Sequence, residues 1–168
     1  MLVEWTGPTQ TDYSVQFLAP GLTVPYIEIA VKKRTFTKTV AVLRQRKCDE
    51  LVVSVSGWSE TFSSTHGYLI DNKPWTKKVF ALCDEIDHHL QPDKFRDRGV
   101  DGQYHACHAE KQLLAYVSHQ HRKTVTLYIS SPPCPDCQRF MSAFVACKGT
   151  RVKVYYIDGT DKLKMIKF

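Results

Sequence analysis

Two kinds of apolar pattern alternate along the chain. Runs rich in β-branched and aromatic residues occupy 26–31, 39–43 and 51–55 with polar turns between them, which is typical of strands. We expect the second and third runs to pair as a hairpin. A fourth run, 125–130, is apolar at most positions and predicts a strand buried on both faces.

The end of the chain carries a second hairpin signal. Residues 151–157 and 162–168 are both β-rich, and the sequence Asp158-Gly159-Thr160-Asp161 separates them. Asp-Gly favours a tight turn because glycine adopts positive φ without steric cost. The pattern therefore predicts that the last two strands are antiparallel.

Three segments have the three- and four-residue apolar spacing of amphipathic helices. The first covers 75–90 and stops before Pro92, the second covers 106–117, and the third carries Cys134 and Cys137 in its first turn. This order of strands and helices predicts an α/β protein with three layers, α/β/α, in which helices cover both faces of a mixed sheet of about five strands.

Two segments show no sustained periodic pattern of apolar residues. Residues 1–23 contain several glycine and proline breakers, so we expect an irregular N-terminal arm, and 57–74 are expected to form a long polar loop. A chain of 168 residues suits one domain, 1–168, with its chemistry concentrated in 105–147.

Composition narrows the class of protein. With 43% hydrophobic and 24% charged residues, the chain is unlike disordered, collagen-like or coiled-coil proteins. The net charge of +6 favours an anionic partner such as nucleic acid. The sequence has no apolar run of membrane-spanning length and no signal-peptide pattern at its N-terminus, so we expect an intracellular protein without a membrane partner, or a domain cut from a longer chain.

Cysteine and histidine positions separate structural from chemical roles. The six cysteines are unevenly spaced in a chain large enough to need no disulfides, which favours metal binding or core packing. We expect Cys48, Cys83, Cys107 and Cys147 to be buried core residues. The histidines at or near helix ends are expected to be exposed or to interact with helix C-termini: His88, His89, His119 and His121.

The remaining cysteines form a metal-ligand pattern with one histidine. His108-Ala109-Glu110 opens one predicted helix, and Pro133-Cys134-Pro135-Asp136-Cys137 opens the next. Zinc binds imidazole and thiolate, and two cysteines three positions apart in a first helical turn bring both sulfurs near one ion. Helix N-termini also favour the thiolate form. We therefore expect His108, Cys134 and Cys137 to bind Zn²⁺.

Three protein ligands leave the fourth tetrahedral position open to water, as in catalytic zinc sites. Glu110 lies two residues from His108, where it can exchange a proton with that water without being a ligand. The pattern predicts a hydrolytic site with Glu110 as its catalytic residue.

The motif H-x-E followed by P-C-x-x-C is the signature of zinc-dependent base deaminases. Over residues 105–168 the chain resembles the cytidine deaminase-like superfamily, and this resemblance implies the same three-layer fold, one catalytic zinc and Glu110 as proton shuttle. Residues 130–137 resemble the corresponding AID/APOBEC motif. Residues 108–114 and the closing hairpin resemble DYW-type and related fungal or bacterial deaminases, although Gln138 stands where a DYW domain has the histidine of its second zinc site.

The resemblance implies deamination of cytosine to uracil in single-stranded nucleic acid, DNA or RNA, because a base stacked in a duplex cannot reach such a site. Candidates for substrate contact are Trp58, Tyr104, His105, Ser130 and Ser131. Further candidates for stacking are Phe62 and Tyr68, and those for phosphate contact are the basic residues within 32–34, 44–47, 77–78 and 122–123.

Three alternatives stay open from the sequence. The protein could deaminate a small molecule such as cytidine or a free base, it could act on adenine, or it could be a non-enzymatic, zinc-stabilised module that binds nucleic acid. Roles in editing, defence or as a toxin fit the same residues, and nothing in the pattern identifies protein partners or an oligomeric state.

Overall fold

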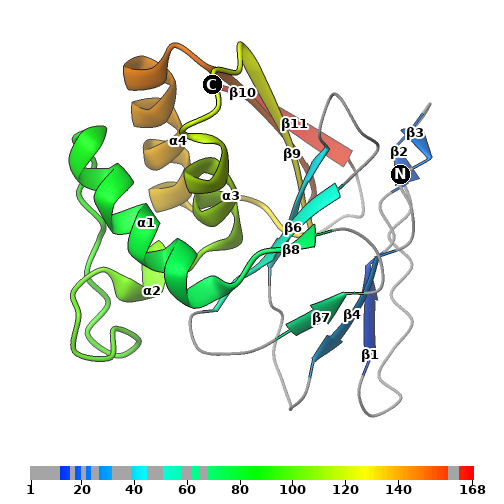
Figure 1. The fold of residues 1–168 in the computed structure, drawn as a ribbon, viewed down its shortest axis with the longest axis horizontal. Coiled ribbons are helices and arrows are strands. Elements are labelled where there is room, and N and C mark those ends of the chain that lie inside the picture. The colour runs from blue at the N-terminus through cyan, green and yellow to red at the C-terminus, as the bar shows by residue number, and fades with distance from the viewer. Residues whose placement is uncertain are drawn as a thin grey trace.

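The computed structural model describes most of the chain from residue 68 onward and shorter stretches before it. The described residues are 12–15, 18–19, 22–23, 27–31, 39–44, 51–57, 62–64, 68–158 and 163–168. Figure 1 shows the helices gathered beside a central sheet, with a smaller sheet next to it.

The central sheet has six strands in the order β11-β10-β9-β5-β6-β8. Their bounds are Val40–Arg44 (β5), Leu51–Val55 (β6), Tyr68–Leu69 (β8), Thr124–Ile129 (β9), Arg151–Ile157 (β10) and Leu163–Lys167 (β11). β9 pairs parallel with β10 and antiparallel with β5, and β5 and β6 form the expected antiparallel hairpin. β10 and β11 also pair antiparallel. The α/β class with a mixed sheet is confirmed, and the short β8 makes six strands where about five are expected.

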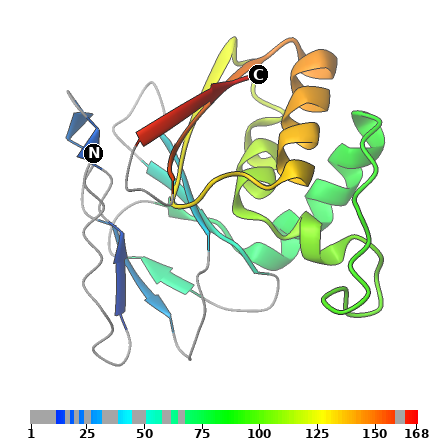
Figure 2. The same ribbon diagram turned by 180° about the vertical axis from the view of Figure 1, so that it is seen from behind.

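The helices lie together on one side of this sheet in both ribbon views (Figures 1 and 2). They are α1 (Asn72–Glu85), α2 (Gln103–Ala106), α3 (Ala109–Val117) and α4 (Pro135–Lys148). The expectation of helices on both faces is therefore not met among the described residues. The connections explain why. The helices lie in the connections from β8 to β9 and from β9 to β10, and both connections join parallel strands and step across the sheet in the same direction. Right-handed crossovers of this kind place their helices on the same face.

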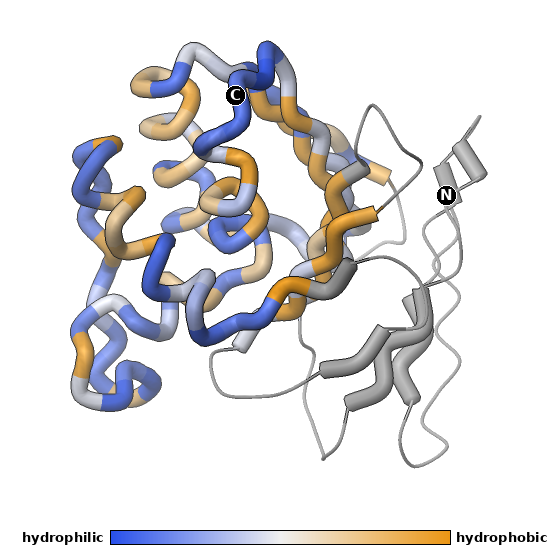
Figure 3. Tube along the Cα trace, in the orientation of Figure 1, coloured by the Kyte–Doolittle hydropathy of each residue, from blue (hydrophilic) through white to orange (hydrophobic). Residues whose placement is uncertain are grey.

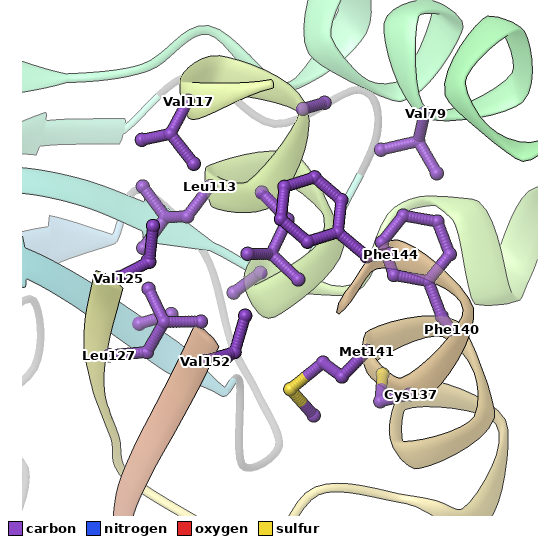
Figure 4. Close-up of a cluster of buried hydrophobic side chains, with 14 of the residues drawn as sticks. Val79, Leu113, Val117, Val125, Leu127, Cys137, Phe140, Met141, Phe144 and Val152 are labelled. Atoms are coloured by element: carbon purple, nitrogen blue, oxygen red, sulfur yellow. The ribbon is translucent and has the colours of Figure 1, made fainter. Parts of the chain in front are cut away.

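One hydrophobic core joins the helices to the sheet. The strands are mostly apolar, whereas the helices alternate between apolar and polar residues, as Figure 3 shows. Figure 4 shows Val79 of α1, Leu113 of α3, Phe144 of α4 and Leu127 of β9 in one buried cluster, and each of the four is at most 1% exposed. The opposite face of the sheet is buried as well, since Val42 is 0% exposed there. This core fixes the position of α3 relative to α4.

Both segments without a regular pattern contain strands. Within 1–23 the structure has β1 (Asp12–Val15), β2 (Leu18–Ala19) and β3 (Leu22–Thr23), and within 57–74 it has β7 (Phe62–Ser64) as well as β8. β1 and β7 pair with β4 (Ile27–Val31) in a second sheet. The expectation of an irregular arm and a long polar loop is wrong for the residues in these strands. β2 and β3 pair with each other, whereas β1 and β7 depend on β4, a partner elsewhere in the sequence that a local pattern does not reveal.

Two helix boundaries also differ from expectation. The helix expected over 106–117 begins only at Ala109, and the separate short helix α2 ends at Ala106, because His108 between them takes an extended conformation, with φ −70° and ψ 137°. The first helix spans Asn72–Glu85, where 75–90 is expected, because Asp71 caps its N-terminus and Asp87 beyond its end has a φ of 55°. None of the described helices has the length and apolar character needed to span a bilayer.

A pair of glycines tests how tightly the turn before α2 is packed. Gly102 (φ +77°) and Gly99 (φ +85°) share a backbone conformation that disfavours L side chains, but only at Gly102 would a Cβ meet another atom, Leu90 Cβ, at 2.6 Å. Both Gly→Ala variants should lower the free energy of unfolding by roughly 1–2 kcal/mol, because an L residue disfavours positive φ. Gly102→Ala should lower it by about 1–3 kcal/mol more, because its Cβ overpacks against Leu90. Denaturant unfolding of the two variants measures the difference, and equal losses would contradict this packing.

Candidate metal centre

The first turns of α3 and α4 meet at one end of the central sheet. His108 is the residue that precedes α3, and Cys134 is the N-cap of α4, with its sulfur accepting a hydrogen bond from the backbone N–H of Cys137 at 3.4 Å. Pro135 opens α4, where its fixed φ and missing N–H suit the first helical position. The chain thus brings one imidazole and two thiols together at two helix N-termini.

The distances among these three side chains fit a tetrahedral ion. His108 Nδ1 lies 3.3 Å from Cys137 Sγ and 3.5 Å from Cys134 Sγ. Zinc bonds of about 2.3 Å to sulfur and about 2.0 Å to nitrogen, at a tetrahedral angle, separate the two ligand atoms by about 3.5 Å. Both distances from His108 Nδ1 are therefore those expected if one zinc ion binds all three residues.

Two further side chains approach the same point. Ligand atoms of His108, Glu110 and Cys137 all lie within 4.8 Å of one another, as do those of His105, His108 and Cys134. Zinc prefers nitrogen and sulfur ligands where these are present. This preference makes Glu110 the least suitable ligand of the group. His105 also offers a nitrogen, and the H-x-E and P-C-x-x-C motifs favour His108 and the two cysteines over it.

The electrostatics favour anionic sulfur. Hydrogen bonds from Cys137 and His108 lower the pKa of the Cys134 thiol to about 3, although burial opposes the shift. The pKa of Cys137 is raised, because its thiol is hydrogen-bonded to Cys134 and is buried. At neutral pH at least one of the two sulfurs is thus a thiolate, which is the form that binds metal.

Glu110 is a buried carboxyl group in the first turn of α3. It is 3% exposed, and its Oε2 has no hydrogen-bond partner among the described residues. Burial raises the pKa of this carboxyl, so it holds a proton more readily than an exposed glutamate. A carboxyl in this state, beside the candidate metal ligands, is suited to accept and return a proton.

A buried ion pair joins the two helices behind the candidate ligands. Lys111 follows Glu110 in α3 and is 0% exposed, and Asp136 lies between Cys134 and Cys137 in α4 and is 2% exposed. Lys111 Nζ pairs with Asp136 Oδ2 and also donates to the carbonyl oxygen of His105, at 3.0 Å. Although burial raises the pKa of Asp136, the hydrogen bond and charge of Lys111 bring it below its ordinary value.

Two histidines and an arginine surround this pair. Nitrogen atoms of His88 and His105 lie 3.5 Å and 3.9 Å from the carboxylate oxygens of Asp136, and Arg139 Nη2 lies 3.2 Å from Oδ1. Burial lowers the pKa of both histidines, so both are neutral at pH 7. The expectation for His88 is therefore wrong: it is 8% exposed and packs edge-on against Phe140, because the chain reverses after α1.

The sequence candidates for substrate contact fall into three groups. The rings of Tyr104 and His105 lie beside the candidate centre, with centroids 5.1 Å and 5.2 Å from that of His108. Ser130 and Ser131 use their hydroxyls to join the end of β9 to β5, through Val40 N and Thr39 Oγ1, each at 3.0 Å. Trp58 lies outside the described residues.

The remaining sequence candidates for contact with the substrate lie outside the described residues or away from the candidate centre. The side chains of Phe62 and Tyr68 and most of the basic residues within 32–34 and 44–47 also lie outside the described part of the chain. Lys77 and Lys78 are exposed on α1. The predicted burial is confirmed for Cys83 and Cys107, but Cys147 is exposed at the end of α4. Cys48 is outside the described residues.

Four residues around the candidate centre are specified by no sequence motif and were not predicted as part of it: Lys111, Asp136, His88 and Arg96. Lys111 and Asp136 each adjoin motif residues, so a search for opposite charges next to the two motifs could have found them. Arg96 donates from Nη1 to the Tyr104 hydroxyl, and its Cζ lies 3.8 Å from the ring centroid of that residue. No local pattern indicates that contact, because it depends on the turn between α1 and α2.

Loss of the buried lysine should destabilise the fold. Lys111→Met leaves the Asp136 carboxylate buried without its cation, and breaking such a pair costs about 3–5 kcal/mol. Lys148→Met is a matched control, because Lys148 pairs with Glu85, whose side chain is 50% exposed, and a surface pair contributes below about 1 kcal/mol. Denaturant unfolding of both variants tests the difference, and equal stability losses would contradict it.

Comparison with known proteins bears on the central part of the chain. Residues 53–114 match the family model described as single-strand DNA deaminase toxin A, C-terminal. The matched stretch contains His108 and Glu110 but ends before Cys134 and Cys137. No curated protein matches the chain. The similarity supports a relationship with single-strand DNA deaminases.

Proposed function

We propose that this protein is a zinc-dependent deaminase that converts cytosine to uracil in single-stranded DNA. The observation that carries the proposal is the approach of His108 Nδ1 to the sulfurs of Cys137 and Cys134, at 3.3 Å and 3.5 Å, with a carboxylate oxygen of Glu110 within 4.8 Å of the ligand atoms of His108 and Cys137. In this proposal His108, Cys134 and Cys137 hold the metal and Glu110 is the catalytic residue.

The metal and the glutamate have separate tasks. When bound, zinc supplies the Lewis acidity that lowers the pKa of a water toward neutrality. The unpartnered Glu110 Oε2 accepts a proton from the attacking water. His108 and the two cysteines hold the site at the ends of α3 and α4, whose N-terminal partial charges favour the anionic ligands.

Glu110 carries both protons of the water in turn. It delivers the first to N3 of cytosine while the water oxygen bonds to C4. It then transfers the second to the amino nitrogen, and the C4–N bond breaks. Cytosine and water become uracil and ammonia, and Glu110 returns to its starting state. The raised pKa of this carboxyl suits a group that gains and loses a proton in each cycle.

The substrate class rests on similarity and charge. The match of residues 53–114 to a single-strand DNA deaminase family favours DNA over RNA and over a free nucleoside. The net charge of +6 is suited to a polyanion. The choice of cytosine over adenine as the target base rests on the resemblance of the two motifs to those of cytidine deaminases. We take residues 1–168 as one deaminase domain, since α1, α3 and α4 share one core with the sheet.

A deamination assay with a matched pair of glutamate variants tests the proposal. Single-stranded DNA, RNA and free cytidine are incubated with zinc-loaded protein, and C-to-U and A-to-I changes are measured. Wild-type protein should convert cytosine in DNA. Glu110→Gln should lose about 10²–10⁴-fold in kcat while keeping its zinc, whereas Glu85→Gln, an exposed residue of α1, should retain full activity.

The other outcomes assign the other functions. Conversion of free cytidine alone, at a rate insensitive to salt, would indicate a small-molecule deaminase, and A-to-I changes would move the chemistry to adenine. Binding of DNA without conversion, unaffected by Glu110→Gln and lost on chelation, would indicate a zinc-stabilised binding module.

A further inference from the structure

The segment that joins α1 to α2 carries an exposed aromatic side chain, Phe95, and next to it a basic side chain, Arg96, that contacts a neighbour of His108. We call residues 91–102 the Phe95 loop. It projects beyond the helices in both ribbon views (Figures 1 and 2). The Phe95 side chain is 99% exposed, and Val100 in the same loop is 51% exposed. Two of the three exposed large hydrophobic residues in the described part of the chain therefore lie in this loop.

Two aspartates hold the loop in a defined conformation. Asp93 Oδ1 accepts hydrogen bonds from the backbone N–H groups of Phe95 and Arg96, at 3.1 Å and 3.0 Å. The Asp97 carboxylate accepts from the backbone N–H groups of Asp93, Gly102 and Tyr104, each at 2.7 Å. Phe95 is thus exposed on a turn that its own hydrogen bonds hold in one conformation. Because the turn is already ordered, ligand binding there loses less conformational entropy.

Arg96 is held beside the candidate centre by contacts on two sides. Its Nε donates to Asp93 Oδ2 at 2.7 Å, and its guanidinium covers one face of the Tyr104 ring, with Cζ 3.8 Å from the centroid. The Tyr104 ring in turn lies 5.1 Å from that of His108. The Arg96 side chain remains 58% exposed. A planar cation that is fixed in position and still open to solvent is suited to bind phosphate.

We propose that the Phe95 loop binds the DNA strand next to the target cytosine, with Phe95 stacking on a neighbouring base and Arg96 contacting a backbone phosphate. The proposal rests on the proposed function and extends it to residues that no motif includes. Single-strand binding combines aromatic stacking with cationic backbone contacts. Phe95 and Arg96 are adjacent in the sequence and supply one of each, and Arg96 stacks on Tyr104, whose ring lies 5.1 Å from that of His108. Tyr104, covered by Arg96, then serves to orient that arginine.

Two variants and two controls separate these roles. Phe95→Ala and Arg96→Ala are compared with Met165→Ala, an exposed hydrophobic residue on β11, and Arg151→Ala, an exposed arginine at the start of β10. Arg151 pairs with Thr124 at the start of β9, whereas Cys134 and Cys137 follow the end of that strand. Circular dichroism and thermal unfolding verify that all four proteins are folded.

Binding is measured in a Glu110→Gln background, by fluorescence anisotropy with a labelled single-stranded DNA oligonucleotide over a range of salt concentrations. Phe95→Ala should raise Kd about fivefold or more and leave the salt dependence unchanged. Arg96→Ala should raise Kd and reduce the slope of log K against log salt by about 0.7, the contribution of one phosphate of a single strand. With Glu110 intact, both variants should raise KM for the oligonucleotide more than they change kcat.

The outcomes distinguish this proposal from the proposed function. If wild-type protein deaminates no oligonucleotide, the proposed function fails, and the anisotropy data still decide whether the loop binds DNA. If wild-type protein is active but Phe95→Ala and Arg96→Ala match their controls in Kd, KM and salt slope, the loop proposal alone is overturned. An equal loss of RNA binding would overturn the choice of DNA as the partner.

Discussion

The packing of α3 against α4 is the constraint on which the candidate centre depends. Each helix contributes its first turn: His108 and Glu110 come from one, and Cys134 and Cys137 from the other. A shift of one helix by a single turn, about 5.4 Å, would separate the imidazole from both sulfurs. The hydrophobic core below, with Leu113 and Phe144 at 0% and 1% exposure, opposes such a shift.

The buried Lys111–Asp136 pair adds a polar restraint in the same place. Each of its residues is next in sequence to a candidate site residue, Glu110 on one side and Cys137 on the other. An ion pair of this kind contributes little net stability, but leaving one partner alone is costly, so it penalises any arrangement that separates the helices. Its neighbours His88 and His105 have lowered pKa values and are neutral at pH 7, which leaves Lys111 as the fully buried cation facing Asp136.

Local sequence predicts those parts of this fold that local interactions determine. The strands β5, β6, β9 and β10 and the start of α4 follow from alternation, apolar runs and the Pro-Cys-Pro pattern. The meeting of His108 with the two cysteines follows from spacing, because both motifs lie at helix starts with one strand between them. The strands β1 and β7 could not be found in this way, since β4, their common partner, lies elsewhere in the sequence. Stacking of Arg96 on Tyr104 likewise depends on a turn fixed by Asp93 and Asp97.

The central claim is that one zinc ion binds to His108, Cys134 and Cys137. Zinc X-ray absorption spectroscopy on the purified protein, combined with metal analysis, tests it most directly. The account predicts one zinc per chain, with two sulfur neighbours at about 2.3 Å and lighter nitrogen or oxygen neighbours at about 2.0 Å. A zinc with no sulfur neighbours, or a folded and active protein without bound metal, would contradict it.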